Sequence, residues 1–125
     1  MKNYTMTKYL FDTYAIIEII EGNSDYEKYV DEEIIINDFV FAELCYSLIK
    51  TNYSNLDLYI KKYEEFSVPL EAETIKKAMQ FRHENKKKKL SMTDCISYFQ
   101  AKELGIKFLT GDKEFENLEN VEFIK

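Results

Sequence analysis

The segment Phe39-Val40-Phe41-Ala42-Glu43-Leu44-Cys45-Tyr46-Ser47-Leu48-Ile49 decides how the rest of the chain is arranged. Nine of its eleven residues are apolar or aromatic, which predicts a helix over 38–50 that is covered by protein on every side. Glu43 is its only charged residue. Because burying a lone carboxylate is costly, Glu43 requires a cation, hydrogen-bond donors or a proton. A lysine or arginine elsewhere in the fold, or a partly exposed helix that lies against a partner chain, would account for it equally well.

Short apolar segments of strand length alternate with helical patterns on both sides of this helix. The predicted strands are 8–11, 33–37, 66–68, 106–110 and 121–124, and the predicted helices are 13–21, 25–30, 38–50, 56–63, 71–85, 91–104 and 113–117. Helical crossovers return each strand to the same direction, so the pattern predicts an α/β fold with a mainly parallel sheet. In such sheets the functional site lies at the carboxyl ends of the strands, near a topological switch point.

The composition is that of a soluble globular protein. With 125 residues, 46% of them apolar and 32% charged, the chain is expected to form a single domain over 1–125. No apolar run is long enough to span a bilayer, and the N-terminus lacks the pattern of a leader, so we expect a cytoplasmic protein without a membrane partner. Cys45 and Cys95 lie in apolar helical patterns, which is typical of buried free thiols in a reducing compartment.

Four acidic residues follow predicted strands or lie in predicted helices. Asp12 follows the first strand, Asp112 follows the fourth across Thr110-Gly111, and Glu43 and Asp94 lie in helices. Taken singly they have structural explanations, because Asp12 and Asp112 are suited to cap helices and Asp94 would gain about 0.3–1 kcal/mol from a helix dipole. Together they would repel one another unless cations lie among them. Such oxygen ligands select Mg²⁺ or Mn²⁺, which is the chemistry of phosphodiester cleavage.

Four motifs occur in a familiar order: Tyr9-Leu10-Phe11-Asp12-Thr13, Phe41-Ala42-Glu43-Leu44, Leu90-Ser91-Met92-Thr93-Asp94-Cys95-Ile96 and Leu109-Thr110-Gly111-Asp112-Lys113-Glu114-Phe115. In these motifs the chain resembles the PIN-domain ribonucleases, most closely the VapC-type toxins of toxin–antitoxin modules. The resemblance implies a three-layer sandwich in which helices flank a parallel five-stranded sheet of order 3-2-1-4-5. The ends of the first and fourth strands would then lie side by side.

The resemblance also implies roles for individual residues. Asp12, Glu43, Asp94 and Asp112 match the catalytic, metal-binding carboxylates of the family, and Glu116 matches a further acidic residue of some members. Thr110 matches a hydroxyl that hydrogen-bonds a carboxylate or water beside the metal. Asn37 stands at a supporting position where many relatives have serine or threonine, and this departure affects only the surroundings of the metal ligands.

The function implied is that of an endoribonuclease dependent on Mg²⁺ or Mn²⁺, the toxin of a type II toxin–antitoxin system. Its products would carry 5′-phosphate and 3′-hydroxyl ends, and its expected partners are RNA, a cognate antitoxin and a second copy of the chain. Two alternatives remain open. One is a non-catalytic PIN-like domain whose acidic cleft captures a basic segment of a partner, and the other is a housekeeping nuclease that processes RNA.

One basic stretch interrupts a chain whose formal net charge is −6. It contains five positive residues and a single glutamate, Glu84, between residues 82 and 89. The positive residues are Arg82, Lys86, Lys87, Lys88 and Lys89. A run of lysines is usually a solvated loop, but this one lies just before the predicted helix of Asp94 and would be able to hold RNA phosphates at the rim of the cleft.

Overall fold

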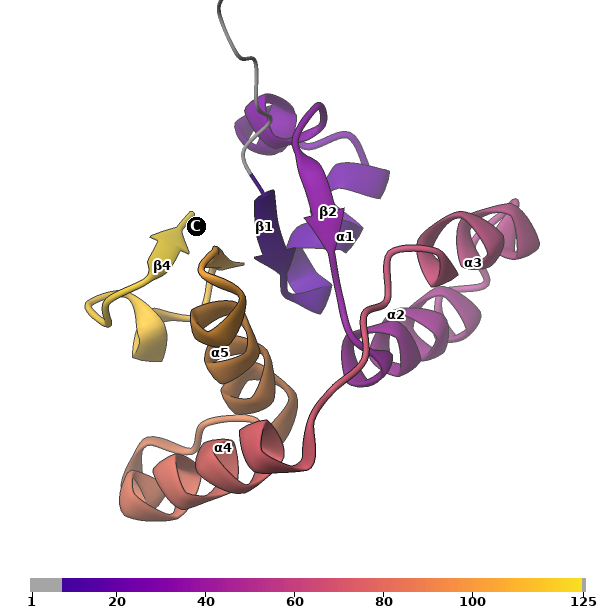
Figure 1. The fold of residues 1–125 in the computed structure, drawn as a ribbon. Helices are drawn as coiled ribbons and strands as arrows, with labels where there is room; N and C mark the ends of the chain where they lie inside the picture. The colour runs from indigo at the N-terminus through magenta and orange to yellow at the C-terminus, as the bar shows by residue number, and fades with distance from the viewer. Residues whose placement is uncertain (1–7, 125) are drawn as a thin grey trace, which may run out of the picture.

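A parallel β-sheet of four short strands forms the centre of the molecule in the computed structural model, which describes residues 8–124 (Figure 1). The strands are β1 (Lys8–Phe11), β2 (Glu33–Ile35), β3 (Lys107–Thr110) and β4 (Val121–Phe123). The α-helices are α1 (Thr13–Ile20), α2 (Asp38–Lys50), α3 (Leu56–Glu64), α4 (Ala72–Glu84) and α5 (Met92–Leu104). Short 3₁₀ helices are η1 (Ser24–Tyr29), η2 (Lys86–Lys88) and η3 (Lys113–Phe115).

Strand β1 lies inside the sheet, between β2 on one side and β3 on the other, and β4 follows beyond β3. All of these pairings are parallel, and Leu10 of β1 is in register with Ile35 of β2 and Phe108 of β3. The chain first visits one side of β1 and later returns to the other side. The carboxyl ends of β1 and β3 therefore form a topological switch point, where open α/β sheets leave a crevice.

The predicted number of five strands is wrong, because the strand expected before Pro69 is reduced to one bridging residue. Ser67 forms an isolated parallel bridge with Ile36. The Ile36 N–H donates to the Phe66 carbonyl oxygen at 3.0 Å, and the Val68 N–H donates to the Ile36 carbonyl oxygen at 2.9 Å. Helix α3 ends just before this segment and Pro69, which has no N–H, follows it, so the pairing cannot lengthen. The predicted spatial order is kept, with the bridge at the outer edge of β2.

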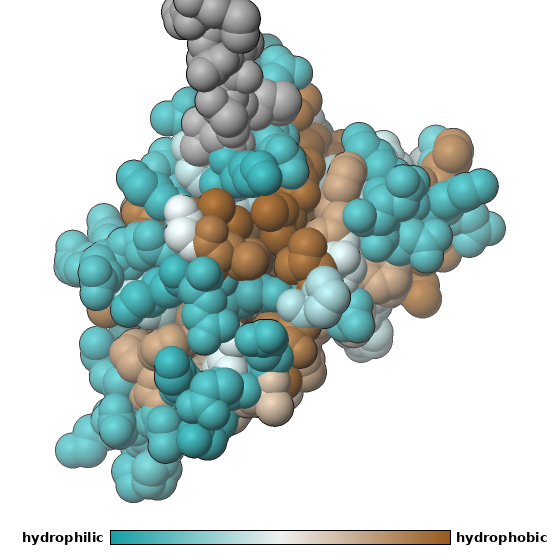
Figure 2. All heavy atoms as spheres, viewed as in Figure 1, coloured by the Kyte–Doolittle hydropathy of each residue, from teal (hydrophilic) through white to brown (hydrophobic). Residues whose placement is uncertain are grey.

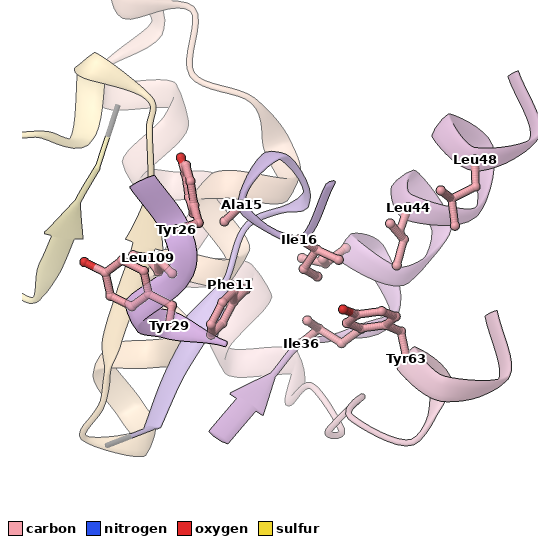
Figure 3. Close-up of a cluster of buried hydrophobic side chains, with 11 residues drawn as sticks. Phe11, Ala15, Ile16, Tyr26, Tyr29, Ile36, Leu44, Leu48, Tyr63 and Leu109 are labelled. Atoms are coloured by element: carbon pink, nitrogen blue, oxygen red, sulfur yellow. The ribbon is translucent and has the colours of Figure 1, made fainter. Parts of the chain in front are cut away.

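Helices cover both faces of the sheet, which confirms the predicted three-layer sandwich. Leu10 and Phe108 belong to a buried cluster with residues of α4 and α5. Their neighbours Phe11 and Leu109 point to the opposite face and belong to a cluster with residues of α1, α2 and α3. Figure 3 shows this second cluster, in which Tyr63 from α3 packs with side chains of α1 and α2.

Helix α2 has the predicted bounds, but only one of its sides is covered in this chain. Val40, Leu44 and Leu48 are buried at a spacing of four residues. Tyr46 and Ile49 remain 66% and 58% exposed. The prediction that protein covers every side of the helix is therefore wrong for the single chain, because an apolar pattern does not distinguish the core from another kind of interface.

Hydrophilic residues cover most of the face seen in Figure 2, and hydrophobic residues are visible near its centre, where Figure 1 places β1 and β2. Within residues 8–124 no helix is both long enough and apolar enough to cross a membrane. Both cysteines are free. Cys95 is buried as predicted, whereas Cys45 is partly exposed because it lies on α2 between buried Leu44 and exposed Tyr46.

Candidate functional site

Hydrogen bonds join the ends of β1 and β3. The Asp12 N–H donates to the Leu109 carbonyl oxygen at 3.0 Å, so the two strands stay paired one residue beyond β1. Asp12 Oδ1 accepts from the Ala15 N–H at 2.7 Å and thereby caps α1, while Asp12 Oδ2 accepts from the Thr110 hydroxyl at 2.6 Å. Thr110 Oγ1 in turn accepts from the Asp112 N–H at 3.1 Å. One hydroxyl therefore orients both Asp12 and the start of the loop that carries Asp112.

Two further carboxylates come from α5 and α2. Asp94 lies in the first turn of α5, where its N–H donates to the Ser91 hydroxyl at 2.9 Å. Glu43 lies on α2, and its Oε1 accepts from the Thr13 hydroxyl at 2.8 Å. Thr13 follows Asp12 directly in the chain. The bond between Thr13 and Glu43 therefore ties α2 to the start of α1, beside Asp12.

The pKa values of the buried carboxyl groups show that these charges lie close together. Burial is the main reason that the pKa of Asp94 rises to about 7. The negative charges of three other residues add to this rise: Asp12, Asp112 and Glu43. Burial, with a smaller contribution from Asp112, also raises the pKa of Asp12 to about 6, although the hydrogen bond from Thr110 opposes the rise. Because a like charge disfavours ionisation only at short range, the four carboxylates converge at the switch point.

Two cavities open beside the carboxylates, and both are lined by Asp12, Tyr14 and Asp94. The larger has a volume of about 500 Å³ and also includes Asp112. The smaller has a volume of about 310 Å³ and extends to Glu43. Small-molecule sites in proteins have volumes of roughly 300–1,000 Å³, so either cavity is large enough to take part of a nucleic-acid strand.

None of the four carboxylates forms an ion pair among residues 8–124, although Lys113 lines the larger cavity. The ion pairs in this part of the chain involve Lys8, Lys76, Lys102 and Lys107, each with an acidic residue outside the site. Carboxylates that crowd together without cations favour protonation or the binding of a metal ion. Their oxygen atoms are the ligands preferred by Mg²⁺ and Mn²⁺. The donor set therefore fits a divalent ion of this kind.

The side chains do not, however, form a complete cage for such an ion. In the part of the chain that the structure describes, no group of three acidic, histidine or cysteine side chains is arranged to hold one metal ion. Mg²⁺ usually keeps several water ligands and takes only one or two carboxylates from a protein. The arrangement therefore fits an ion held partly through water, and the predicted role of all four carboxylates as metal ligands stays a prediction.

Two other predicted site residues, Glu116 and Asn37, do not line either cavity. Glu116 is exposed at the end of η3 and lines neither cavity. Asn37 is fully buried, and its hydrogen-bond partners are Val40, Ser97 and Gln100. Asn37 caps α2 and joins it to α5, because its position just before the helix turns the side chain into the core.

The structure also brings to the cavities four residues to which the sequence assigned no role at the site. Thr13, Ser91 and Lys113 lie within the carboxylate motifs, and Tyr14 directly follows the first of these motifs. Ser91 lines the smaller cavity and caps α5. Their place in or beside a carboxylate motif was the signal that would have identified them.

The basic stretch lies outside both of these cavities. Arg82 is in the last turn of α4, Lys86, Lys87 and Lys88 form η2, and Lys89 follows. All of these side chains are exposed. The sequence correctly places them on the surface, and their predicted contact with RNA stays a prediction.

Gly111, between Thr110 and Asp112, has no room for a side chain. A Cβ atom at this position would lie 2.7 Å from the backbone carbonyl oxygen of Ile124, which cannot move without shifting the end of β4. We expect Gly111→Ala to lower the free energy of unfolding by about 1–3 kcal/mol, measured by urea denaturation. Gly111→Ser should cost at least as much. An unchanged unfolding midpoint for both variants would contradict this packing.

Together these features define a class of protein, an α/β three-layer sandwich with an acidic cleft at the switch point of its parallel sheet. Residues 9–121 match the family model of the PIN domain. The chain therefore belongs to the PIN domain family.

Solved structures share this fold at low sequence identity. A chain of a toxin–antitoxin complex from Klebsiella pneumoniae has a TM-score of 0.74 at 19% identity, over 91% of this chain and 95% of the other. A chain of VapBC2 from Rickettsia felis, solved bound to a DNA fragment from its promoter, has a TM-score of 0.71 at 18% identity, over 94% and 98%. PAE2754 from Pyrobaculum aerophilum has a TM-score of 0.67 at 18% identity, over 94% and 89%. No curated protein is significantly similar to the chain.

Proposed function

We propose that this protein is a metal-dependent endoribonuclease that hydrolyses RNA phosphodiester bonds, and that it is the toxin of a type II toxin–antitoxin pair. The observation that carries the proposal is the convergence of four carboxylates on two cavities that share Asp12 and Asp94, with no ion pair to any of the four among residues 8–124: Asp12, Glu43, Asp94 and Asp112. Membership in the PIN domain family supports it. Carboxylates gathered in this way suit the Mg²⁺ or Mn²⁺ ions that assist phosphodiester cleavage.

Asp12 and Asp94 are the residues best placed to hold the ion, because they are largely buried and line both cavities. Asp112 and Glu43 then contribute mainly through water. Thr110 keeps Asp12 in one orientation, because its hydroxyl binds one carboxylate oxygen while the Ala15 N–H binds the other. The site is thus held rigid by contacts within the protein itself.

When bound, a divalent ion neutralises charge that develops on the phosphate and lowers the pKa of the attacking water. Glu43 is the exposed carboxylate of the set, and Thr13 binds one of its oxygens. Its other oxygen is available to orient this water and to take its proton. Attack on phosphorus breaks the bond to the 3′ oxygen and leaves 5′-phosphate and 3′-hydroxyl ends.

A cognate antitoxin and a second copy of the chain are the protein partners in this proposal. Two of the similar structures are a toxin–antitoxin complex and VapBC2 bound to promoter DNA. Tyr14, Tyr46 and Ile49 expose apolar surface on α1 and α2 that partners of this kind would cover. The proposed place of action is the cytoplasm, where the RNA substrates are. Co-purification of the tagged protein with the product of an adjacent small gene would test the antitoxin part.

One observation favours a second candidate function, a PIN domain that binds without cutting. No three metal-ligating side chains are arranged around one point within residues 8–124. An acidic cleft of this kind would also attract a basic segment of a partner protein. The two candidates differ in whether RNA is cleaved.

Cleavage with defined ends is the direct test. We expect the purified protein to cut single-stranded RNA in Mg²⁺ or Mn²⁺ and to stop when EDTA is added, because the carboxylates alone do not supply the charge neutralisation. The products should be degraded by an exonuclease that requires a 5′-phosphate. Products that end in a 2′,3′-cyclic phosphate, or equal cleavage in EDTA, would contradict the proposal.

A further inference from the structure

Another cavity lies at the end of α4 and is lined by none of the four carboxylates. Its volume is about 330 Å³. Four of its lining residues carry basic side chains, and two are apolar: Arg82, His83, Lys86, Lys89, Met79 and Leu90. No acidic residue is among them. On a chain with a net charge of −6, this is a concave surface of the opposite sign. Figure 2 shows hydrophilic side chains gathered over this end of α4, at the lower left.

The positive side chains that line this basic cavity are not neutralised by acidic side chains of the described residues. Within residues 8–124, neither Arg82, Lys86 nor Lys89 forms an ion pair with an acidic side chain. The Arg82 Nε–H donates to the Leu90 carbonyl oxygen at 2.9 Å, which fixes the guanidinium group against the wall of the cavity. Its terminal N–H groups have no side-chain or backbone acceptor within residues 8–124. A fixed guanidinium with free donors is suited to bind a phosphate.

The backbone selects which lysines reach the cavity. Helix η2 forms a tight turn in which the Lys88 N–H donates to the Asn85 carbonyl oxygen at 2.9 Å. Lys89 then adopts the left-handed conformation, with φ at 57°. As a result Lys86 and Lys89 line the cavity, whereas Lys87 and its neighbour Lys88 do not.

The basic cavity lies next to the carboxylate site. Leu90 lines the basic cavity, and the following residue, Ser91, lines the smaller carboxylate cavity. One strand that leaves the carboxylates past Ser91 would therefore reach the basic cavity.

We propose that the basic cavity binds a backbone phosphate of the single-stranded RNA substrate, at a nucleotide outside the scissile bond. Arg82, Lys86 and Lys89 contact this phosphate, while Met79 and Leu90 pack against the sugar. The acidic body of the protein repels RNA, and this contact holds the strand across the carboxylates. The inference rests on the proposed nuclease function and adds to it how the substrate is held.

A matched pair of double variants tests the inference. Lys86→Gln with Lys89→Gln removes two charges from the cavity, and Lys87→Gln with Lys88→Gln removes two from the same stretch outside it. The probe is a fluorescein-labelled RNA of about 12 nucleotides and mixed sequence, a length near the upper part of common single-strand site sizes. Binding is measured by anisotropy at several salt concentrations, with Asp94→Asn present in every variant so that the probe stays intact.

We expect the double variant of Lys86 and Lys89 to weaken RNA binding about tenfold or more. It should reduce the slope of log K against log salt by up to about 0.7, the contribution of one neutralised phosphate of a single strand. The control double variant of Lys87 and Lys88 should weaken RNA binding less than about threefold. Equal losses of RNA affinity in both double variants, or no loss in either, would overturn the inference. A third outcome would also overturn it. If the double variant of Lys86 and Lys89 binds RNA normally but inorganic phosphate no longer raises its melting temperature, the cavity takes a free anion and not RNA.

Cleavage of RNA by the unaltered protein tests the proposed function separately from the basic cavity. Failure of the unaltered protein to cleave RNA would refute the nuclease, whatever the binding data show. Normal cleavage together with equal binding losses would refute only the basic cavity. Each double variant must melt within a few degrees of the parent protein, and we expect both to do so because the altered side chains are exposed.

Discussion

Asp94→Asn should lower the rate of RNA cleavage by at least about 100-fold, the order of effect seen when one charged or polar group is removed from a preorganised site. The amide has nearly the same shape as the carboxylate but no charge to hold a divalent ion. The substitution therefore removes the chemistry and keeps the N-terminal turn of α5, whose cap is the separate Ser91 hydroxyl. The rate is measured with excess protein over labelled RNA in Mg²⁺ and in Mn²⁺.

The same substitution should raise the stability of the metal-free protein. The charges of Asp12, Asp112 and Glu43 and the burial of the group all disfavour ionised Asp94. Removing its charge relieves this repulsion at pH 8, by an amount on the order of 1–3 kcal/mol. A loss of activity with a gain of stability distinguishes a functional carboxylate from a structural one.

Asp57→Asn is the matched control. Asp57 also lies in the first turn of a helix, α3, but it is exposed and lies outside the cavities beside the carboxylates. Its substitution should leave cleavage unchanged and cost about 0.3–1 kcal/mol through the lost interaction with the helix dipole. If Asp94→Asn cleaves as fast as the unaltered protein, the assignment of the carboxylate site fails.

The metal-free protein should lose stability as the pH rises from about 4 to 7. The folded-state pKa values of Asp12 and Asp94 are about 6 and about 7, above the ordinary value of 3.8. Between pH 4 and pH 7 the folded state therefore binds more protons than the unfolded state, so stability is full at low pH and is lost through the folded pKa values. One pKa unit corresponds to about 1.4 kcal/mol, and we expect a total loss on the order of 2–4 kcal/mol.

Thermal melts in EDTA across this pH range measure the effect, and Asp94→Asn should remove the larger share of it. Adding Mg²⁺ or Mn²⁺ at pH 8 should restore stability, by about 2.7 kcal/mol at a concentration 100 times the dissociation constant. Sodium chloride at equal ionic strength controls for screening. A melting temperature at pH 8 that responds to sodium chloride and to Mg²⁺ alike would argue against a metal site.

The arrangement of the strands was largely predictable from the sequence, because each strand is a short apolar run bounded by polar or turn residues. The strand before Pro69 was predicted at full length and was reduced to the bridge of Ser67 with Ile36. Pairing there depends on how α3 ends and how the chain reaches β2, and neither is encoded in the three residues of the segment. Local pattern identified the place of the strand but not its length.

The burial of helix α2 was not predictable from its sequence. Its apolar composition predicted burial on every side, and Glu43 was expected to need compensation within the core. In the structure Glu43 is exposed, and the pKa values of Asp12 and Asp94 are the ones raised by burial. Which carboxylate is buried depends on the packing of α1 and α5 around the sheet, and no spacing within a single helix reports it.

The sequence by itself determined the elements, their parallel arrangement and the identity of the four acidic residues, because these depend on local patterns and motif order. Only the tertiary structure decided that Thr110 binds Asp12, that Asn37 faces α5 instead of the carboxylates, and that Lys86 and Lys89 line a cavity. These contacts join residues far apart in the chain, or depend on one left-handed turn. Distances of this kind follow from how the layers pack, which no stretch of the sequence specifies alone.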